Sequence, residues 1–416
     1  MRTSKAGEGF AGDLSLVKRG QPGFLWSSSI EMPAGSMVDL RQHAVSKLVD
    51  VLGCVNIAQN TKPGLSRSAL ALYLKGCGMI SDINTSEPSE ELLSVFRQLT
   101  VDAPRFAPGW ANLAFLEVQS WPSTPPRDRP ALVRRTREHL RRAKQIDAEL
   151  PVAIAADASL PEHWQNPLQA LAIIERGLKV HPDSALLHGL RSESLATVGR
   201  TAESVDEALN AMQLNPLSPA DRNRYLSTLA YAGRTNKAFD ELKKAEAIWP
   251  GSEVLRQARY RLDLRYGDPR NALRLLKERG AGDLRPIPLD MAWQAFIEAR
   301  IDPRATNVER ALEAFRARYR RRPADIWGYV QALGTFGRVD EAFAAFEPDA
   351  AIDGAKGTPD TLFRVHMRPI YSDPRFMRVA HRLGLLGYWK QSDRWPDFCS
   401  DPRLPYDCRK EAAKYR

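Results

Sequence analysis

The chain has 416 residues, of which 43% are hydrophobic and 26% charged, a composition typical of a folded protein and not of a disordered one. This length exceeds one ordinary compact core and predicts several domains or one long array, and no run of about 18 apolar residues is present to span a membrane. The formal net charge is +10, but the basic residues are mixed with Glu and Asp along the chain, which favours solvated helix faces over a nucleic-acid-binding surface.

Residues 1–60 predict a small mixed α/β segment. Residues 14–17 and 23–27 read as two short strands, and residues 37–52 have apolar side chains at helical spacing. Two strands and one helix are too small to be stable alone. We therefore expect this segment either to pack on the helices that follow or, as the favoured alternative, to be the end of a domain that begins upstream of this sequence.

A regular period runs through the middle of the chain. Prolines keep a constant step at Pro182, Pro216 and Pro250, and glycines keep the same step at Gly199, Gly233 and Gly267. A fixed period of this length indicates stacked copies of one small structural unit. Such a chain displays a long surface instead of enclosing a reaction.

Residues 185–218 show what one copy contains. A helical apolar pattern runs to Val198, and Gly199 then makes a turn, because glycine takes the left-handed conformation without steric penalty. A second helix follows over residues 202–214, and Pro216 ends it. About eight such helix pairs are expected over residues 66–347, stacked into a right-handed superhelix with the first helices on its concave face.

Helix, glycine turn, helix and proline at this spacing resemble the tetratricopeptide repeat. Ala114 and Ser192 match the small residue of the family's first helix, and its second-helix alanines are matched at Ala170, Ala211, Ala238, Ala245 and Ala272. The resemblance implies an all-α tetratricopeptide-type α-solenoid that binds a protein or peptide in its concave groove. First helices line that groove in the family, so the candidate ligand contacts are Asn112, His188, Arg191, Arg222 and Tyr225. The alternative for each is ordinary packing or exposure.

Residues 358–416 do not repeat and are rich in aromatic side chains. A solenoid needs a cover over its last apolar face, so we expect an irregular C-terminal capping segment here. Cys399 and Cys408 lie close together in this stretch of the sequence. They can close a disulfide in an oxidising compartment, or they can remain two thiols.

Part of this tail also resembles a bacterial architecture. The sharpest matches are Tyr388-Trp389, Trp395-Pro396-Asp397-Phe398-Cys399 and Leu404-Pro405-Tyr406-Asp407-Cys408, with Leu72-Tyr73-Leu74-Lys75-Gly76 at the start of the array. They resemble the C-terminal part of regulators in which a tetratricopeptide array follows a TolB-like domain. The resemblance implies that residues 1–60 are a remnant of that domain and that the chain is the sensory part of a transcriptional or signalling regulator. The alternative is a fragment whose missing N-terminal part is a CadC-like winged-helix DNA-binding domain or an adenylate cyclase domain.

Motifs for catalysis are absent from the sequence. It has no H-E-x-x-H, G-x-S-x-G or P-loop pattern and no cysteine or histidine pair at zinc-ligand spacing, so we predict no enzyme, no cofactor and no metal. The N-terminus lacks the apolar stretch of a secretory signal, which predicts a cytoplasmic protein. The membrane-anchored version of the regulator architecture would instead place this region in the periplasm, where Cys399 and Cys408 could pair.

Overall fold

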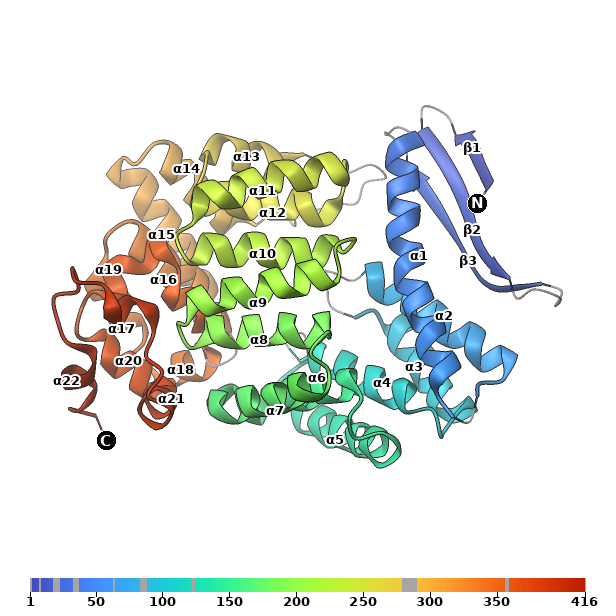
Figure 1. The fold of residues 1–416 in the computed structure, drawn as a ribbon. Helices are drawn as coiled ribbons and strands as arrows, with labels where there is room; N and C mark the ends of the chain where they lie inside the picture. The colour runs from blue at the N-terminus through green and yellow to red at the C-terminus, as the bar shows by residue number, and fades with distance from the viewer. Residues whose placement is uncertain are drawn as a thin grey trace.

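The computed structural model describes most of the chain, namely residues 2–6, 9–17, 23–32, 37–62, 64–82, 88–121, 124–278, 290–355 and 359–415. Within these ranges a small N-terminal sheet is followed by a long series of helices that stack side by side (Figure 1). The fold is therefore an all-α solenoid with a small β-sheet at its N-terminal end.

The N-terminal sheet has three antiparallel strands, β1 (Arg2–Ala6), β2 (Gly9–Val17) and β3 (Phe24–Met32), in the order β1-β2-β3. The two predicted strands were too short, and β1 was not predicted. Ala11 of β2 pairs with Ser4 on one side and Glu31 on the other. The segment before Leu14 has three glycines and only one β-branched residue, so pairing with neighbours and not intrinsic propensity makes it a strand.

Two helices cover this sheet. They are α1 (Met37–Asn60) and α2 (Arg67–Asp82). Leu14, Trp26 and Ile30 are buried in one apolar cluster with residues of both helices, and a disulfide between Cys54 of α1 and Cys77 of α2 adds a covalent link across a Cα–Cα distance of 6.5 Å. The sequence analysis did not find this disulfide. It ties the sheet and α1 to the start of the array, because α2 is the first helix of the first pair.

Eight helix pairs make up the described part of the array, as the sequence predicts. The first helices are α2, α4 (Ala107–Gln119), α6 (Pro151–Ala158), α8 (Ala185–Thr197), α10 (Pro219–Tyr231), α12 (Glu253–Arg265), α14 (Met291–Ile301) and α16 (Ile326–Thr335). The second helices are α3 (Glu90–Asp102), α5 (Arg129–Ile146), α7 (Pro167–Val180), α9 (Thr201–Leu214), α11 (Thr235–Ile248), α13 (Pro269–Lys277), α15 (Ala305–Arg321) and α17 (Val339–Ala345). From α6 to α13, the helix starts of both series keep the same constant step as the prolines.

Serine caps begin the central first helices at the same interval. Ser184, Ser218 and Ser252 each accept a hydrogen bond at Oγ from the backbone N–H three residues later, at 3.3, 3.1 and 3.5 Å. A capping oxygen satisfies one of the backbone donors that a helix start leaves unpaired. This periodic signal is present in the sequence, although the prediction of the repeat used only its prolines, glycines and small residues.

Glycines end the first helices of two central pairs and of the last one. Gly199, Gly233 and Gly337 have φ values of +80°, +76° and +72°, and the arginine after each donates its N–H to a carbonyl five residues back. This is the left-handed helix ending that favours glycine. Gly267 occupies the same place in the period but not this conformation. A Cβ there would lie 2.4 Å from Asp263 Oδ1, so lack of space explains this glycine.

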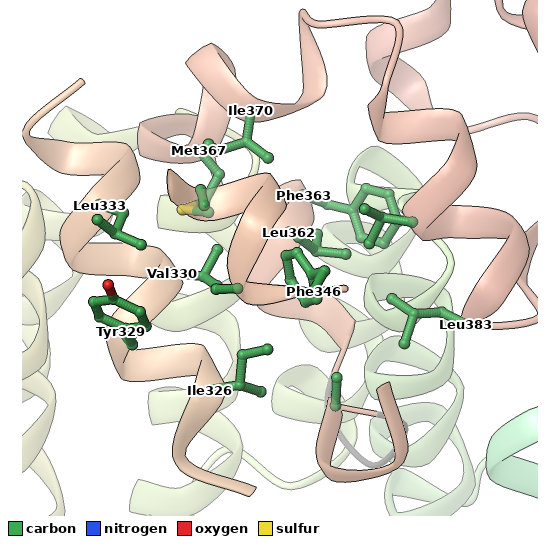
Figure 2. Packing of buried hydrophobic residues seen from close by; sticks show 14 of the residues in the cluster. Ile326, Tyr329, Val330, Leu333, Phe346, Leu362, Phe363, Met367, Ile370 and Leu383 are labelled. Carbon is green, nitrogen blue, oxygen red and sulfur yellow. The ribbon is translucent and has the colours of Figure 1, made fainter. Parts of the chain in front are cut away.

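The last part of the chain is a set of short helices. They are α18 (Asp349–Ala355), η4 (Pro359–Phe363), η5 (Val365–Met367), α19 (Arg368–Tyr371), α20 (Phe376–Arg382), α21 (Leu385–Ser392), η6 (Asp397–Ser400) and α22 (Cys408–Ala412), with η1 (Pro161–Gln165) and η3 (Pro323–Asp325) earlier in the chain. We call residues 359–415 the C-terminal segment. It packs on α16, where Val330 and Leu333 lie in one apolar cluster with Leu362, Met367 and Ile370 (Figure 2).

This segment also reaches back to the centre of the array. Trp389 donates its indole N–H to the carbonyl of Val198 at 2.9 Å, and the Asp397 carboxylate accepts from Thr201 Oγ1 and from the Ala202 backbone N–H, each at 2.7 Å. The Cys399–Cys408 disulfide, with a Cα–Cα distance of 5.8 Å, closes the loop just after Asp397. The C-terminal segment is therefore more than a cover for the last pair, since it also fastens to the turn between α8 and α9.

His366 of η5 makes the free energy of unfolding depend on pH. Burial, followed by the charges of Arg265, Arg364 and Arg300, keeps the pKa of His366 well below 6.5. The unfolded chain therefore binds a proton that the folded chain refuses, and its free energy of unfolding is expected to fall by about 1.4 kcal/mol per unit as pH drops below about 6.5. Urea denaturation between pH 7.5 and 5.5 measures this slope. His366→Gln should flatten it, and an unchanged slope in that variant would contradict the assignment.

No helix in the described ranges is both long and apolar enough to cross a bilayer.

Candidate functional site on the first helices

An ion pair or charged hydrogen bond joins the two helices of each of two central pairs. In α8 and α9, His188 Nδ1 lies 2.6 Å from a carboxylate oxygen of Glu207, and in α10 and α11 an Arg222 guanidinium nitrogen lies 3.2 Å from Glu241. His188 and Arg222 occupy equivalent positions in successive copies, as do Glu207 and Glu241. Each of these two copies therefore has a polar connection between its own two helices, in addition to its apolar packing.

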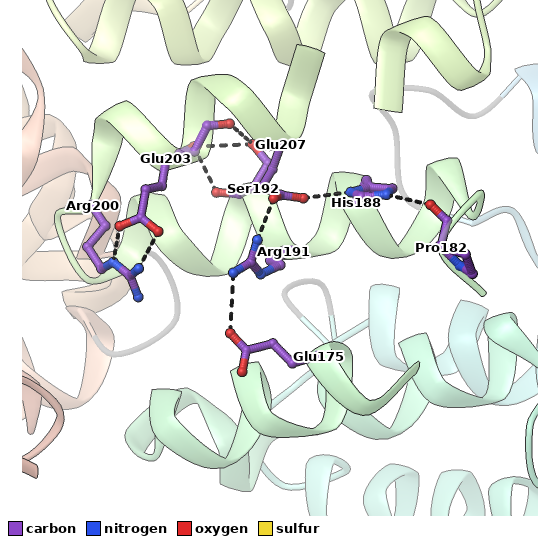
Figure 3. Close-up of polar contacts among 9 residues, drawn as sticks. Glu175, Pro182, His188, Arg191, Ser192, Arg200, Glu203 and Glu207 are labelled. Atoms are coloured by element: carbon purple, nitrogen blue, oxygen red, sulfur yellow. Dashed lines mark hydrogen bonds and ion pairs between the residues drawn. The ribbon is translucent and has the colours of Figure 1, made fainter. Parts of the chain in front are cut away.

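Glu207 is the centre of the largest of these networks (Figure 3). Besides His188, it accepts a hydrogen bond from Arg191, whose other terminal nitrogen lies 3.3 Å from Glu175 of α7. His188 Nε2 lies 2.9 Å from the carbonyl oxygen of Pro182, so both ring nitrogens lie beside oxygen atoms. Through these contacts Arg191 and His188 connect α7, α8 and α9.

Two buried serines hold α8 and α9 close together beside this network. Ser192 Oγ donates to the Ser204 carbonyl at 2.7 Å, and Ser204 Oγ donates to the Ser192 carbonyl at 2.8 Å. Both residues are almost fully buried. The sequence analysis matched Ser192 to the small residue in the first helix of the tetratricopeptide repeat, and the reciprocal hydrogen bonds explain why both positions are serines.

The five predicted groove residues do not form one cluster. His188 and Arg191 share the Glu207 network, while Arg222 pairs with Glu241 in the next repeat. Tyr225 is 3% exposed and belongs to the apolar core of its pair. Asn112 of α4 donates its side-chain N–H to the Pro108 carbonyl in its own helix at 2.8 Å. The structure thus brings two of the five together.

Arg224 is a charged residue on this surface that the sequence analysis missed. It contacts Glu193 of α8 at 3.0 Å and also pairs with Asp221 of its own helix. Burial lowers the pKa of the Arg224 guanidinium, but the charges of Glu193 and Asp221 outweigh burial and raise it. A signal was present in Gly189, because a Cβ there would lie 2.7 Å from an Arg224 nitrogen, and a glycine inside a helix marks such a close approach.

Arginines outnumber acidic residues on the central first helices. Helices α8, α10 and α12 carry seven arginines, Arg191, Arg222, Arg224, Arg256, Arg259, Arg261 and Arg265, against Glu193, Asp221, Glu253 and Asp263. Several carboxylates that pair with these arginines come from the second helices. One of them, Glu246 of α11, raises the pKa of Arg259 through a hydrogen bond. These three first helices therefore carry more basic than acidic residues of their own.

A carboxylate-centred network also joins the helices of the α4 and α5 pair, with Glu117 at its centre. This fully buried carboxylate of α4 accepts from Arg135 Nε at 2.6 Å, from Thr136 Oγ1 at 3.2 Å and contacts His139 Nδ1 at 2.9 Å. Burial raises the pKa of Glu117, but the hydrogen bonds from His139 and Arg135 outweigh burial and lower it.

An open cleft of about 470 Å³ is lined by residues of α5, α6 and η1. Its basic side chains are already paired, since Arg137 contacts Glu162 at 3.0 Å and Lys144 contacts Asp157 at 2.5 Å. Among the described residues that line this cleft, no unpaired charge points to a ligand, so we place the candidate site on the first helices and not here.

Glu207→Gln is expected to lower the free energy of unfolding by about 2 kcal/mol, because it leaves His188 and Arg191 without their shared carboxylate. Glu241→Gln, the equivalent change one repeat later, should cost about 1 kcal/mol, since Glu241 pairs with Arg222 and an exposed Lys244. Urea denaturation of both variants measures the difference. Equal losses would show that the Glu207 network stabilises the fold no more than the contacts of Glu241 do.

No protein-family model matches this chain, and no curated protein matches it by sequence. Among solved structures, yeast Tom70 gives a TM-score of 0.39 at 13% identity, covering 88% of this chain and 74% of that one. The human IFIT1 dimer with m7Gppp-AAAA gives a TM-score of 0.40 at 14% identity, covering 91% of this chain and 84% of that one. Similarity at this level carries no argument about ligands, so the description of the chain as a tetratricopeptide-like solenoid rests on its own helix pairs.

Proposed function

We propose that the first-helix surface of α8, α10 and α12 binds an acidic peptide segment of a protein partner, without covalent chemistry. The observation that supports this is the excess of arginines on these three helices. Arginine donates up to five hydrogen bonds in a planar fork that suits carboxylates. An extended acidic segment could therefore contact several repeats at once, as helical-repeat surfaces allow.

The ion pairs within the repeats prepare this surface for binding. Glu175 and Glu207 hold Arg191, while Glu193 and Asp221 hold Arg224, and these two arginine side chains keep 22% and 24% of their surface exposed. Side chains that are already fixed lose less conformational entropy when a ligand binds. The intramolecular carboxylates thus position the guanidinium groups and leave part of each available.

The test uses a fluorescein-labelled octaglutamate peptide and measures its binding by fluorescence anisotropy. A double variant, Arg191→Gln with Arg224→Gln, is expected to weaken binding about tenfold. The matched control is Arg375→Gln with Arg403→Gln, which removes two exposed arginines of the C-terminal segment. Circular dichroism confirms that both variants fold. Equal weakening in both, or no binding by the unmodified protein, would overturn the proposal.

We further propose that this binding surface is the sensory part of a bacterial regulator, on the basis of the tail and array motifs described above. The aromatic tail motif docks on the α8–α9 turn, so it also has a structural role in this chain. The DNA upstream of the coding sequence tests the fragment alternative. An in-frame winged-helix or cyclase domain would support it, and a stop codon followed by a separate ribosome-binding site would contradict it.

We also propose the periplasmic alternative over the cytoplasmic one, and the two disulfides support this proposal because disulfides persist in oxidising compartments. Mass spectrometry of protein purified from its native host without reductant is expected to show a loss of two hydrogens for each bridge. Four free thiols would instead support the cytoplasmic prediction.

A further inference from the structure

Three arginines and a histidine meet where the C-terminal segment crosses the later repeats. Arg265 ends α12, Arg300 lies on α14, and Arg364 and His366 lie in the C-terminal segment. The ring of His366 packs against the ring of Tyr266 with centroids 5.5 Å apart, and Arg265 Nε donates to Gln331 Oε1 of α16 at 3.0 Å. These contacts place groups from four separate parts of the chain in one cluster, which we call the arginine cluster.

The positive charge of this cluster is only partly neutralised. Arg364 pairs with Asp360 at 2.7 Å and lies over the Tyr231 ring at 4.5 Å. Arg300 donates to the carbonyls at the end of α12, including Leu264 O at 2.6 Å, and feels the charges of Asp263 and Asp268. Arg265 has neutral partners, namely Gln331, the Arg261 carbonyl at 3.4 Å and the Trp293 ring at 5.5 Å. Within the described ranges, no carboxylate oxygen lies within 4.0 Å of its guanidinium nitrogens.

Burial and the nearby charges also change the pKa of Arg265. Burial, with the charge of Arg364 next in size, lowers the pKa of Arg265 to about 10. The same surroundings lower the pKa of His366 and keep its ring neutral. Even a partly buried cation is usually paired with an anion, because removing a charge from water is costly unless it is paired.

Hydrogen-bonding atoms in the cluster are also unpaired. Five buried side-chain atoms lack a partner among the described protein atoms: His366 Nδ1 and Nε2, Tyr266 Oη, Gln331 Nε2 and Arg364 Nε. Isolated unpaired atoms occur elsewhere, for example on Arg191, Arg222 and Arg256. The arginine cluster differs because four neighbouring residues share the feature, and Gln331 among them is 2% exposed. Buried polar groups in folded proteins nearly always have a partner.

We propose that the arginine cluster binds a small oxyanion of the phosphate or sulfate class, between the later repeats and the C-terminal segment. Unpaired hydrogen-bond donors and an uncompensated guanidinium are the two features that such an anion satisfies together. Water could satisfy the donors but not the charge. Because the unpaired polar atoms are buried, the proposal is restricted to a small free anion and does not extend to the end of a macromolecule. Its binding would join Arg364 and His366 of the C-terminal segment to Arg265 of the array.

The test compares thermal unfolding in phosphate, in sulfate and in chloride at equal ionic strength. For the unmodified protein we expect the Tm to be about 2 °C or more higher in saturating phosphate or sulfate than in chloride. Arg265→Gln should remove this difference. Arg222→Gln, which removes an arginine already paired with Glu241, should keep it. A bound anion should also raise the pKa of His366, which NMR of its ring carbons can follow.

Two results would overturn the proposal. One is the absence of any phosphate or sulfate effect on the Tm of the unmodified protein. The other is an equal effect in all three proteins, which would mean non-specific ion binding. If Arg265→Gln fails to fold, equilibrium dialysis of radiolabelled phosphate against the unmodified protein decides the matter. One saturable phosphate per chain supports the site, and no saturable binding rejects it.

Discussion

Trp389→Ala is expected to lower the free energy of unfolding by about 4 kcal/mol, in the range for truncating a fully buried tryptophan. Trp389 is 0% exposed, and its ring packs against Phe363 and Trp395 at centroid distances of 6.1 Å each. Its indole N–H is the donor to the Val198 carbonyl. The substitution therefore leaves a cavity at the point where the C-terminal segment meets the centre of the array.

Urea denaturation followed by circular dichroism measures this loss. The control is Trp389→Phe, which keeps most of the apolar volume and removes the hydrogen bond to Val198, and it should cost about 2 kcal/mol. Limited proteolysis adds a second readout, since the C-terminal segment of Trp389→Ala should be cut faster than that of the control. A loss of less than about 1 kcal/mol for Trp389→Ala would show that the docking contributes little.

Gly199→Ala is the second change with a large expected effect, about 3 kcal/mol. The φ of +80° at this position disfavours any residue with a Cβ. In addition, a Cβ would lie 2.6 Å from Pro396 Cβ and 2.7 Å from a Phe363 ring carbon. Both of these atoms belong to the C-terminal segment, so the methyl group must push that segment away or distort the turn.

Gly337→Ala is the matched control for this effect. Gly337 has a similar φ of +72°, but a Cβ there would have no neighbour within 4 Å. It should therefore cost about 1 kcal/mol, from backbone strain alone. The difference between the two variants, measured by urea denaturation, isolates the contact between turn and segment. Equal losses would mean that the C-terminal segment does not rest on Gly199 in solution.

The array was predictable because its signals are local. The prolines, the glycine turns at Gly199 and Gly233 and the helical apolar pattern each lie within one copy, and the period multiplies them. This is enough to place the helix starts at a constant interval and to give eight pairs. Serine caps at Ser184, Ser218 and Ser252 carry the same information and would have fixed the starts of three helices from the sequence.

Features that depend on distant contacts were not predictable in this way. Strand β1 exists because it pairs with β2, and the Cys54–Cys77 disulfide depends on how α1 lies against α2. No spacing rule in the sequence reports either. The docking of Trp389 on Val198 joins residues 191 positions apart, so only the three-dimensional path of the chain reveals it.

The candidate site was predictable only in part, for a related reason. The period correctly places His188, Arg191 and Arg222 on first helices, and it repeats their carboxylate partners Glu207 and Glu241. It does not say which side of a helix faces a neighbour. Tyr225 therefore looked like a groove residue although its side chain is in the core, and Arg224 was overlooked.

In a helical-repeat array each unit contacts only its neighbours, so the whole array can stretch and bend by small changes at each interface. The strap formed by Trp389 and Asp397 changes this, because it ties the eighth pair back to the α8–α9 turn of the fourth. The helix pairs between these two points cannot move apart unless the contacts of Trp389 and Asp397 break. Bending of the array should therefore occur mainly between the helix pairs that precede α8. A partner that requires the array to change its curvature should bind to those pairs.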